Sequence, residues 1–223
     1  MKKVIIGLLL SLCMSSVFAA ETAVLKITGT VTSTACTPEF SNGGVVNYGV
    51  IRMGELSSTG INQLGQKRID LTINCTAATK VAWNLVDDRL DSNAHLTVAN
   101  GVFTGGSQST ANQTYGVGKA GNVNIGSYAM FVKVDSVLAD GNQVDTVYQQ
   151  SGSTTWAKNT DGASEGQNSR NITVAAPGSV EPLAFETATF PLVTSLAIQD
   201  TNALAITDDT SLDGQLTISL KYL

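Results

Sequence analysis

The sequence predicts an all-β protein built as an antiparallel β-sandwich, and three observations support this. Short runs that alternate apolar and polar residues recur after residue 20 and are separated by turn-forming residues. The composition is rich in Thr, Val, Ser, Asn and Gly. No stretch shows an apolar period of 3.6 residues over three helical turns. Many short strands joined by such turns are typical of two packed antiparallel sheets.

Residues 1–20 have the three parts of a secretory signal peptide. Lys2 and Lys3 supply the positive start, residues 4–12 form an apolar run, and a small-residue cleavage site allows cutting after Ala19 or Ala20. The apolar run is shorter than the roughly 20 residues that a membrane-spanning helix needs. We therefore expect an exported chain whose mature length, about 200 residues, fits one large β-domain.

Two cysteines remain after cleavage, because Cys13 leaves with the signal peptide. In an oxidising compartment Cys36 and Cys75 are expected to form a disulfide, which stabilises the fold by roughly 3–4 kcal/mol in the chain-entropy model. The alternative, a metal site, lacks further ligands because His95 is the sole histidine of the sequence.

Eight segments have the length and alternation of strands. They are residues 24–32, 45–51, 67–75, 80–86, 128–135, 144–149, 183–187 and 215–223. In the third segment one face carries Ile69, Leu71, Ile73 and Cys75, and the other carries Arg68, Asp70, Thr72 and Asn74. This alternation predicts one buried face and one solvated face, with Cys75 pointing inward.

The middle of the chain, residues 101–169, is rich in Gly, Asn, Ser and Gln. We predict loops and short edge strands that decorate the sandwich. Disorder is the alternative, but Tyr115, Phe131, Tyr148 and Trp156 supply apolar anchors and favour ordered loops.

The N-terminal part of the mature chain has an apolar row. Its members are Ala23, Leu25, Ile27, Gly29 and Val31, with polar side chains on the opposite face. A glycine inside a strand often marks a place where another backbone approaches closely. The row can be an ordinary first strand of its own sandwich or a segment that pairs elsewhere.

The C-terminal segment alternates up to its last residues. Apolar positions recur at Leu212, Gly214, Leu216, Ile218, Leu220 and Tyr222. Chain ends usually fray unless a sheet holds them. We therefore expect this strand to be held by a neighbour.

The order and spacing of these features resemble the pilins of the chaperone-usher pathway. The resemblance covers residues 22–85 and 210–223, whereas the middle of the chain has no counterpart. It is carried by Gly29 in the N-terminal row, Cys36 seven residues later, the segment Val46-Asn47-Tyr48-Gly49-Val50, Cys75 at the end of an alternating strand, and the penultimate Tyr222. This chain is longer than most such subunits and ends in Leu223.

The resemblance implies an immunoglobulin-like sandwich that is incomplete without a donated strand. It divides the chain into a signal peptide (1–20), a donor-strand extension (21–32) and a pilin-like domain (33–223). A periplasmic chaperone is expected to lend the missing strand, and in the fibre the extension of a neighbouring pilin subunit replaces it, in a form of β-augmentation.

The same resemblance assigns roles to residues at the two ends of the chain. The N-terminal row (Ala23, Leu25, Ile27, Gly29 and Val31) is the donor strand. Leu216, Ile218, Leu220 and Tyr222 would line the edge of the groove, and basic chaperone residues would take the carboxylate of Leu223. Export would then pass through the periplasm and an outer-membrane usher to the cell surface.

The net charge and the lack of recognisable motifs argue against a nucleic-acid-binding protein, a membrane-surface protein and an enzyme. Without Lys2 and Lys3, 11 basic residues face 18 acidic ones, a net charge of about −7, which disfavours nucleic acid and anionic membrane surfaces as partners. We expect no enzyme activity and no cofactor, because no nucleophile, acid–base pair or metal set emerges. The aspartates at 87, 88 and 91 and at 208, 209 and 213 are interpreted as solvated turn residues rather than calcium ligands.

The leading hypothesis is a structural subunit of a pilus or fimbria that contributes to adhesion. An alternative is an adhesin subunit that binds a host glycan or receptor, with exposed Trp83 or Trp156 as its first candidate contacts. A third possibility is a periplasmic β-sandwich that completes its own fold and is a stable monomer.

Overall fold

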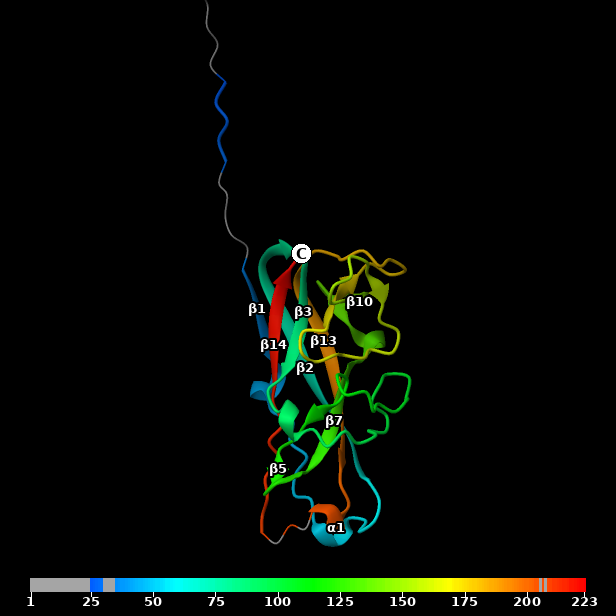
Figure 1. Cartoon of the computed structure of the whole chain (residues 1–223). Coiled ribbons are helices and arrows are strands. Elements are labelled where there is room, and N and C mark those ends of the chain that lie inside the picture. Colours follow the sequence, from blue (N-terminus) through cyan, green and yellow to red (C-terminus); the bar gives the residue numbers. More distant parts are fainter. Residues whose placement is uncertain (1–24, 30–34, 205, 207) are drawn as a thin grey trace, which may run out of the picture. The chain divides into compact units, whose positions relative to one another are not determined.

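Two antiparallel sheets form the sandwich that the sequence predicts. The computed structural model describes residues 25–29, 35–204, 206 and 208–223. The chain divides into an N-terminal segment, residues 1–33, and a compact unit that starts at residue 34. The compact unit holds every assigned strand, and Figure 1 shows its arrangement. No helix in the described part of the chain is long and apolar enough to cross a membrane.

The first sheet has the order β1-β2-β13-β7-β4, and β8 pairs with β13 and with β9. The strands of this sheet are β1 (Cys36–Phe40), β2 (Asn62–Thr79), β4 (Tyr115–Gly116), β7 (Gly126–Val132), β8 (Leu138–Ala139), β9 (Asn142–Gln143) and β13 (Phe185–Ile198). β13 is its central strand, because it pairs with β2 along one side and with β7 and β8 along the other.

The second sheet has the order β11-β10-β12-β3-β14. Its strands are β3 (Val81–Asp87), β10 (Asp145–Gln150), β11 (Ala157–Lys158), β12 (Arg170–Ala175) and β14 (Leu216–Tyr222). A separate small hairpin pairs β5 (Lys119–Ala120) with β6 (Val123–Asn124). The helical elements are short: η1 (Ser41–Gly44), η2 (Met53–Glu55), η3 (Leu90–Ser92), η4 (Val134–Ser136) and α1 (Thr201–Leu204).

The core lies between the two sheets and follows the predicted alternation. Ile69, Leu71 and Ile73 of β2 are buried, whereas the polar residues between them face outward. Trp83 of the second sheet is fully buried and meets Phe190 of the first sheet edge-on, with ring centroids 5.8 Å apart. Aromatic pairs of this geometry stabilise a core beyond their buried area. The burial of Trp83 corrects the expectation that it is an exposed contact for a receptor.

The predicted disulfide is confirmed and joins Cys36 to Cys75. The two residues face each other directly across the antiparallel pair of β1 and β2. Both side chains are half-buried and pack against the core. The bridge therefore fixes β1 to the rest of the first sheet at the end where β1 begins.

The predicted strands at 80–86, 144–149 and 215–223 agree closely with β3, β10 and β14, and the one at 67–75 lies within the longer β2. The predicted strand at 128–135 is shifted relative to β7, which occupies a central place in the sheet rather than an edge. The strand predicted at 183–187 extends to residue 198, and β12 was missed. Both of these segments are buried on two faces, so they lack the alternation that marks a half-buried strand.

Asp87 departs from the expectation of a solvated turn residue. It ends β3, is 4% exposed, and accepts hydrogen bonds from the backbone N–H groups of Arg89 and Gly116 at 2.9 Å each. Burial raises the pKa of this carboxyl group above its usual value, and the two backbone donors partly oppose that shift. Asp87 therefore ties the end of β3 to β4 rather than facing water.

Candidate strand-acceptor groove

β1 and β14 are the end strands of their sheets and come together at one side of the sandwich. Within the described structure, β1 pairs only with β2, and β14 pairs only with β3. The backbone N–H of Cys36 in β1 donates a hydrogen bond of 2.9 Å to the hydroxyl of Tyr222 in β14. Unpaired edges of this kind present backbone N–H and C=O groups to another strand.

The side chains of β14 alternate as the sequence predicts, but they are not fully covered. Leu216, Ile218 and Leu220 point toward the core and remain half-buried, whereas the residues between them are exposed. Tyr222 and Leu223 are 52% and 47% exposed. The apolar face of β14 therefore has only part of the contacts that a strand inside a sandwich receives.

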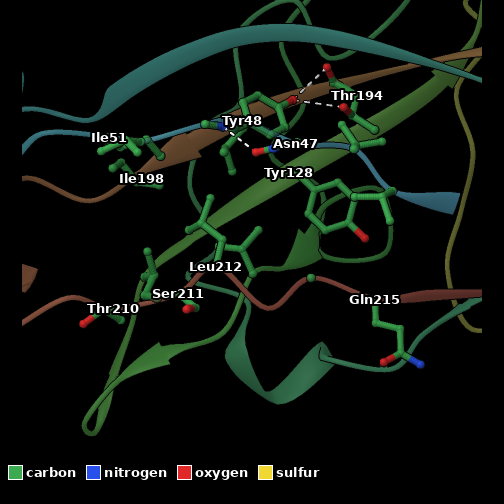
Figure 2. A pocket seen from close by; sticks show the side chains of 18 of the residues that line it. Asn47, Tyr48, Ile51, Tyr128, Thr194, Ile198, Thr210, Ser211, Leu212 and Gln215 are labelled. Atoms are coloured by element: carbon green, nitrogen blue, oxygen red, sulfur yellow. Dashed lines mark hydrogen bonds between the residues drawn. The ribbon is translucent and has the colours of Figure 1, made fainter. Parts of the chain in front are cut away.

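A groove of about 720 Å³ lies where β1 ends and β14 begins, and Phe40 and Leu216 are the residues of these two strands that line it. Its floor is apolar and comes from β2, β7 and β13. One wall is the segment 44–51 after β1, and the other is the segment 208–216 that leads into β14. Figure 2 shows Tyr48 and Ile51 on one side, Leu212 and Gln215 on the other, and Tyr128 between them.

The first wall is held by Tyr48 rather than by strand pairing. The Tyr48 hydroxyl donates to the carbonyl oxygen of Thr194 at 3.0 Å and lies 2.9 Å from its hydroxyl, as Figure 2 shows. Burial raises the pKa of Tyr48, and the hydrogen bond to Thr194 opposes that rise. Gly49 has a φ of +76°, and its N–H donates to the side chain of Asn47 at 2.7 Å.

These contacts explain why the strand predicted at 45–51 is not present. The positive φ of Gly49 and its hydrogen bond to the Asn47 side chain turn the backbone away from the extended geometry of a ladder. The segment instead remains an unpaired wall, on which Val45 and Val50 are 64% and 81% exposed.

The second wall is held by polar contacts to the end of β3 and to β4. Asp213 forms an ion pair with Arg89, with 2.8 Å between Nε and Oδ2, and its backbone N–H donates to the carbonyl of Val117 at 2.8 Å. The Arg89 guanidinium lowers the pKa of the Asp213 carboxyl group. A Cβ at Gly214 would lie 3.1 Å from the ring of Tyr128, so this position favours glycine.

Replacing Tyr48 by phenylalanine tests how the first wall is held. The substitution removes the hydroxyl and leaves the buried carbonyl of Thr194 without this donor, so we expect the free energy of unfolding to fall by about 1–2 kcal/mol. Urea denaturation of the wild-type and Tyr48→Phe proteins measures this difference. An unchanged midpoint would show that the hydrogen bond does not hold the wall.

The described part of the N-terminal row is exposed and has no strand. Leu25 and Ile27 are 87% and 91% exposed, and residues 25–29 have no regular secondary structure. The strand predicted at 24–32 is therefore absent over these five residues, since a strand forms only through pairing. A Cβ at Gly29 would have no neighbour within 4 Å. Ala23, Val31 and the signal peptide lie outside the described residues.

Several groove residues were not predicted as functional. Among the floor residues, Tyr128 and Met130 lie on a segment that was predicted as a short edge strand, and Leu196 and Ile198 lie beyond the strand predicted at 183–187. Leu212 was part of the predicted C-terminal alternation, and Tyr48 was part of a predicted strand. The signal that was missed is that Tyr48-Gly49 combines an aromatic anchor with a residue that tolerates positive φ. In the described chain, no three His, Cys, Asp or Glu side chains gather at one place that could hold a metal ion.

Comparison with known proteins places the chain in a family. Residues 25–129 match the family described as a protein of unknown function, DUF1120. "Uncharacterized protein YhcF" from Escherichia coli strain K12 is 30% identical over 221 residues, which cover 92% of each chain. The chain belongs to the same family as YhcF. Protein GltF from the same strain is 28% identical over 224 residues, which cover 89% of this chain and 87% of GltF.

The DUF1120 match includes the first wall of the groove, residues 44–51, and ends within β7, whereas the alignments with YhcF and GltF cover most of the chain. The names of these relatives state no activity, and the groove is the feature of this family member that bears on function.

Proposed function

We propose that this protein is a structural subunit of a surface fimbria that polymerises by strand donation. The observation that supports it most strongly is the groove of about 720 Å³ between the segment that follows β1 and the segment that leads into β14, the two end strands of their sheets. Each subunit would accept a strand in this groove and offer its own N-terminal row to the next subunit. No catalysis is part of this role.

The groove and the row have matching chemistry. The floor is formed largely by apolar side chains, and β14 offers a free edge along its whole length from Leu216 to Tyr222. An extended segment that lies in the groove beside residues 208–216 would place alternate side chains over the floor, and its continuation along β14 would pair its backbone with that edge. Leu25 and Ile27, which are exposed in the described chain, fit such positions. Their burial would contribute roughly 1.5–3 kcal/mol each.

The sandwich also explains why a donated strand would be needed. The half-buried faces of β14 and of Phe40 in β1 leave core side chains open on one side. Exposed apolar edges promote non-specific association, so a periplasmic chaperone would protect the groove until a neighbouring subunit fills it. At an outer-membrane usher, the strand of the neighbouring subunit would then replace the strand of the chaperone in the groove.

The experiment compares the mature protein with a variant that lacks residues 21–32. Both are expressed in the periplasm, with and without a fimbrial chaperone, and unboiled samples are examined by SDS gel electrophoresis and size-exclusion chromatography. We expect SDS-resistant ladders from the mature protein. The truncated variant keeps the groove but has no strand to donate, so it is expected only as a chaperone complex.

The alternative of a self-contained sandwich gives a different result. In that case both forms would be stable free monomers, and the chaperone would change the yield of neither. A synthetic peptide with the sequence of residues 21–32, added to the truncated domain, gives an independent check. Strand donation requires that this peptide raise the unfolding temperature and that a scrambled peptide leave it unchanged.

A further inference from the structure

One hydrogen bond joins the two end strands β1 and β14, and it lies outside the groove. The hydroxyl of Tyr222 in β14 accepts from the backbone N–H of Cys36, the first residue of β1, at 2.9 Å. Figure 1 shows the start of β1 and the end of β14 near each other, at the end of the sandwich that carries the C-terminus. The groove lies at the other end of these strands, where Phe40 and Leu216 line it. The gap between the two strand edges is therefore bridged at one end and open at the other.

The Cys36 N–H belongs to the free edge of β1. The N–H of Thr76 in β2 donates to the carbonyl of Ala35 at 2.9 Å, whereas Cys36 and Cys75 face each other with their Cα atoms 4.0 Å apart. Antiparallel ladders alternate hydrogen-bonded pairs with closer pairs whose N–H and C=O groups point away from each other. The N–H of Cys36 therefore points away from β2, toward the side on which an additional strand would pair.

The Tyr222 side chain reaches this N–H from a backbone that is itself held in a ladder. Tyr222 pairs with Val81 of β3, and the N–H of Leu223 donates to the carbonyl of Lys80 at 3.1 Å. Tyr222 continues the row of Leu216, Ile218 and Leu220, and it is 52% exposed. The disulfide fixes the donor and the β3–β14 ladder fixes the acceptor, so the hydrogen bond joins two positioned groups.

We propose that Tyr222 is an autoinhibitory latch on the acceptor site. Its hydroxyl occupies the N–H of Cys36 in the free subunit, and the latch opens when a strand is accepted. This inference rests on the proposed strand donation. A strand that pairs with β1 up to its first residue would bring a backbone carbonyl to the Cys36 N–H, and the phenol ring would have to leave the gap.

The latch opposes strand acceptance because its hydrogen bond exists only in the free subunit. A contact that stabilises one of two states lowers the apparent affinity of any ligand that requires the other state. One net hydrogen bond of this kind corresponds to a change of about two- to tenfold in affinity. The latch therefore tunes strand acceptance and does not block it.

The test measures how tightly the mature protein binds a fluorescently labelled peptide with the sequence of residues 21–32. The protein is unfolded in guanidinium chloride and refolded at low concentration, so that the titration starts from monomers, and fluorescence anisotropy gives the dissociation constant. Tyr222→Phe removes only the hydroxyl, and we expect this variant to bind the peptide about two- to tenfold more tightly than wild type. An equal or weaker affinity would overturn the latch and leave strand donation standing.

The matched control is Tyr148→Phe, which removes the same chemical group from β10. Two strands, β12 and β3, separate β10 from β14 in the second sheet. This variant is expected to bind the peptide as wild type does. A similar gain in both variants would show that any lost tyrosine hydroxyl favours binding, and the assignment to Tyr222 would be wrong.

Hydrogen exchange in the free mature protein gives a readout that does not depend on the peptide. The Cys36 amide should exchange faster in Tyr222→Phe than in wild type, while the Thr76 amide, which is bonded to Ala35, should exchange equally in both. Equal exchange of the Cys36 amide would mean that the hydroxyl does not hold it, and would overturn the latch. If the peptide binds to none of the proteins, strand donation itself is wrong and the latch fails with it.

Discussion

Changing Ile27 to aspartate is expected to abolish assembly of the mature protein into SDS-resistant multimers. Ile27 lies on the apolar row and is 91% exposed in the described chain, so the substitution has little to disturb in the isolated domain. In a donated strand the same position would enter an apolar groove. The loss of roughly 1.5–3 kcal/mol of burial, together with the desolvation of a carboxylate, should then prevent insertion.

The matched control is Thr28→Asp, which adds the same charge one residue later. Adjacent residues of a strand point to opposite faces, so residue 28 would face away from the floor of the groove. Unboiled SDS gels should show multimers for Thr28→Asp and only monomer or chaperone complex for Ile27→Asp. Multimers of equal abundance in the two variants would rule out the row as the donated strand.

Removing the disulfide through Cys36→Ser and Cys75→Ser is expected to lower the free energy of unfolding by roughly 3–4 kcal/mol. The bridge closes a loop between residues 39 apart in sequence and restricts the unfolded chain accordingly. It also holds β1, whose Cys36 N–H donates to Tyr222, so its loss should loosen one end of the groove. Urea denaturation of the oxidised and the double-serine proteins measures the effect.

A reductant supplies the control for the disulfide prediction. Wild-type protein unfolded under reducing conditions should match the double-serine variant, whereas the variant itself should not respond to the reductant. Equal urea midpoints for the oxidised wild type and the variant would show that the fold does not depend on the bridge.

The alternating segments could be predicted from the sequence because one of their faces is buried and the other is solvated. This holds for β2, where Ile69 to Cys75 alternate, and for β14, where Leu216 to Tyr222 do the same. The pairing of Cys36 with Cys75 could be predicted from the cysteine count and from the expectation of export. These features are local or compositional, so they leave a clear trace in the sequence.

The parts that were missed depend on tertiary contacts. β12 and most of β13 are buried on both faces, and Pro191 inside β13 further weakens the strand signal. The wall formed by residues 44–51 alternates like a strand but pairs with none, because Tyr48 anchors it to Thr194.

The position of Trp83 gives the protein an internal optical probe. Its indole is fully buried, its Nε1 has no hydrogen-bond partner in the described chain, and the residue pairs with Leu220 of β14. An indole in such apolar surroundings fluoresces at shorter wavelength than one in water, so unfolding shifts its emission to the red. The separation of the two sheets can therefore be followed by the intrinsic fluorescence of the unlabelled protein.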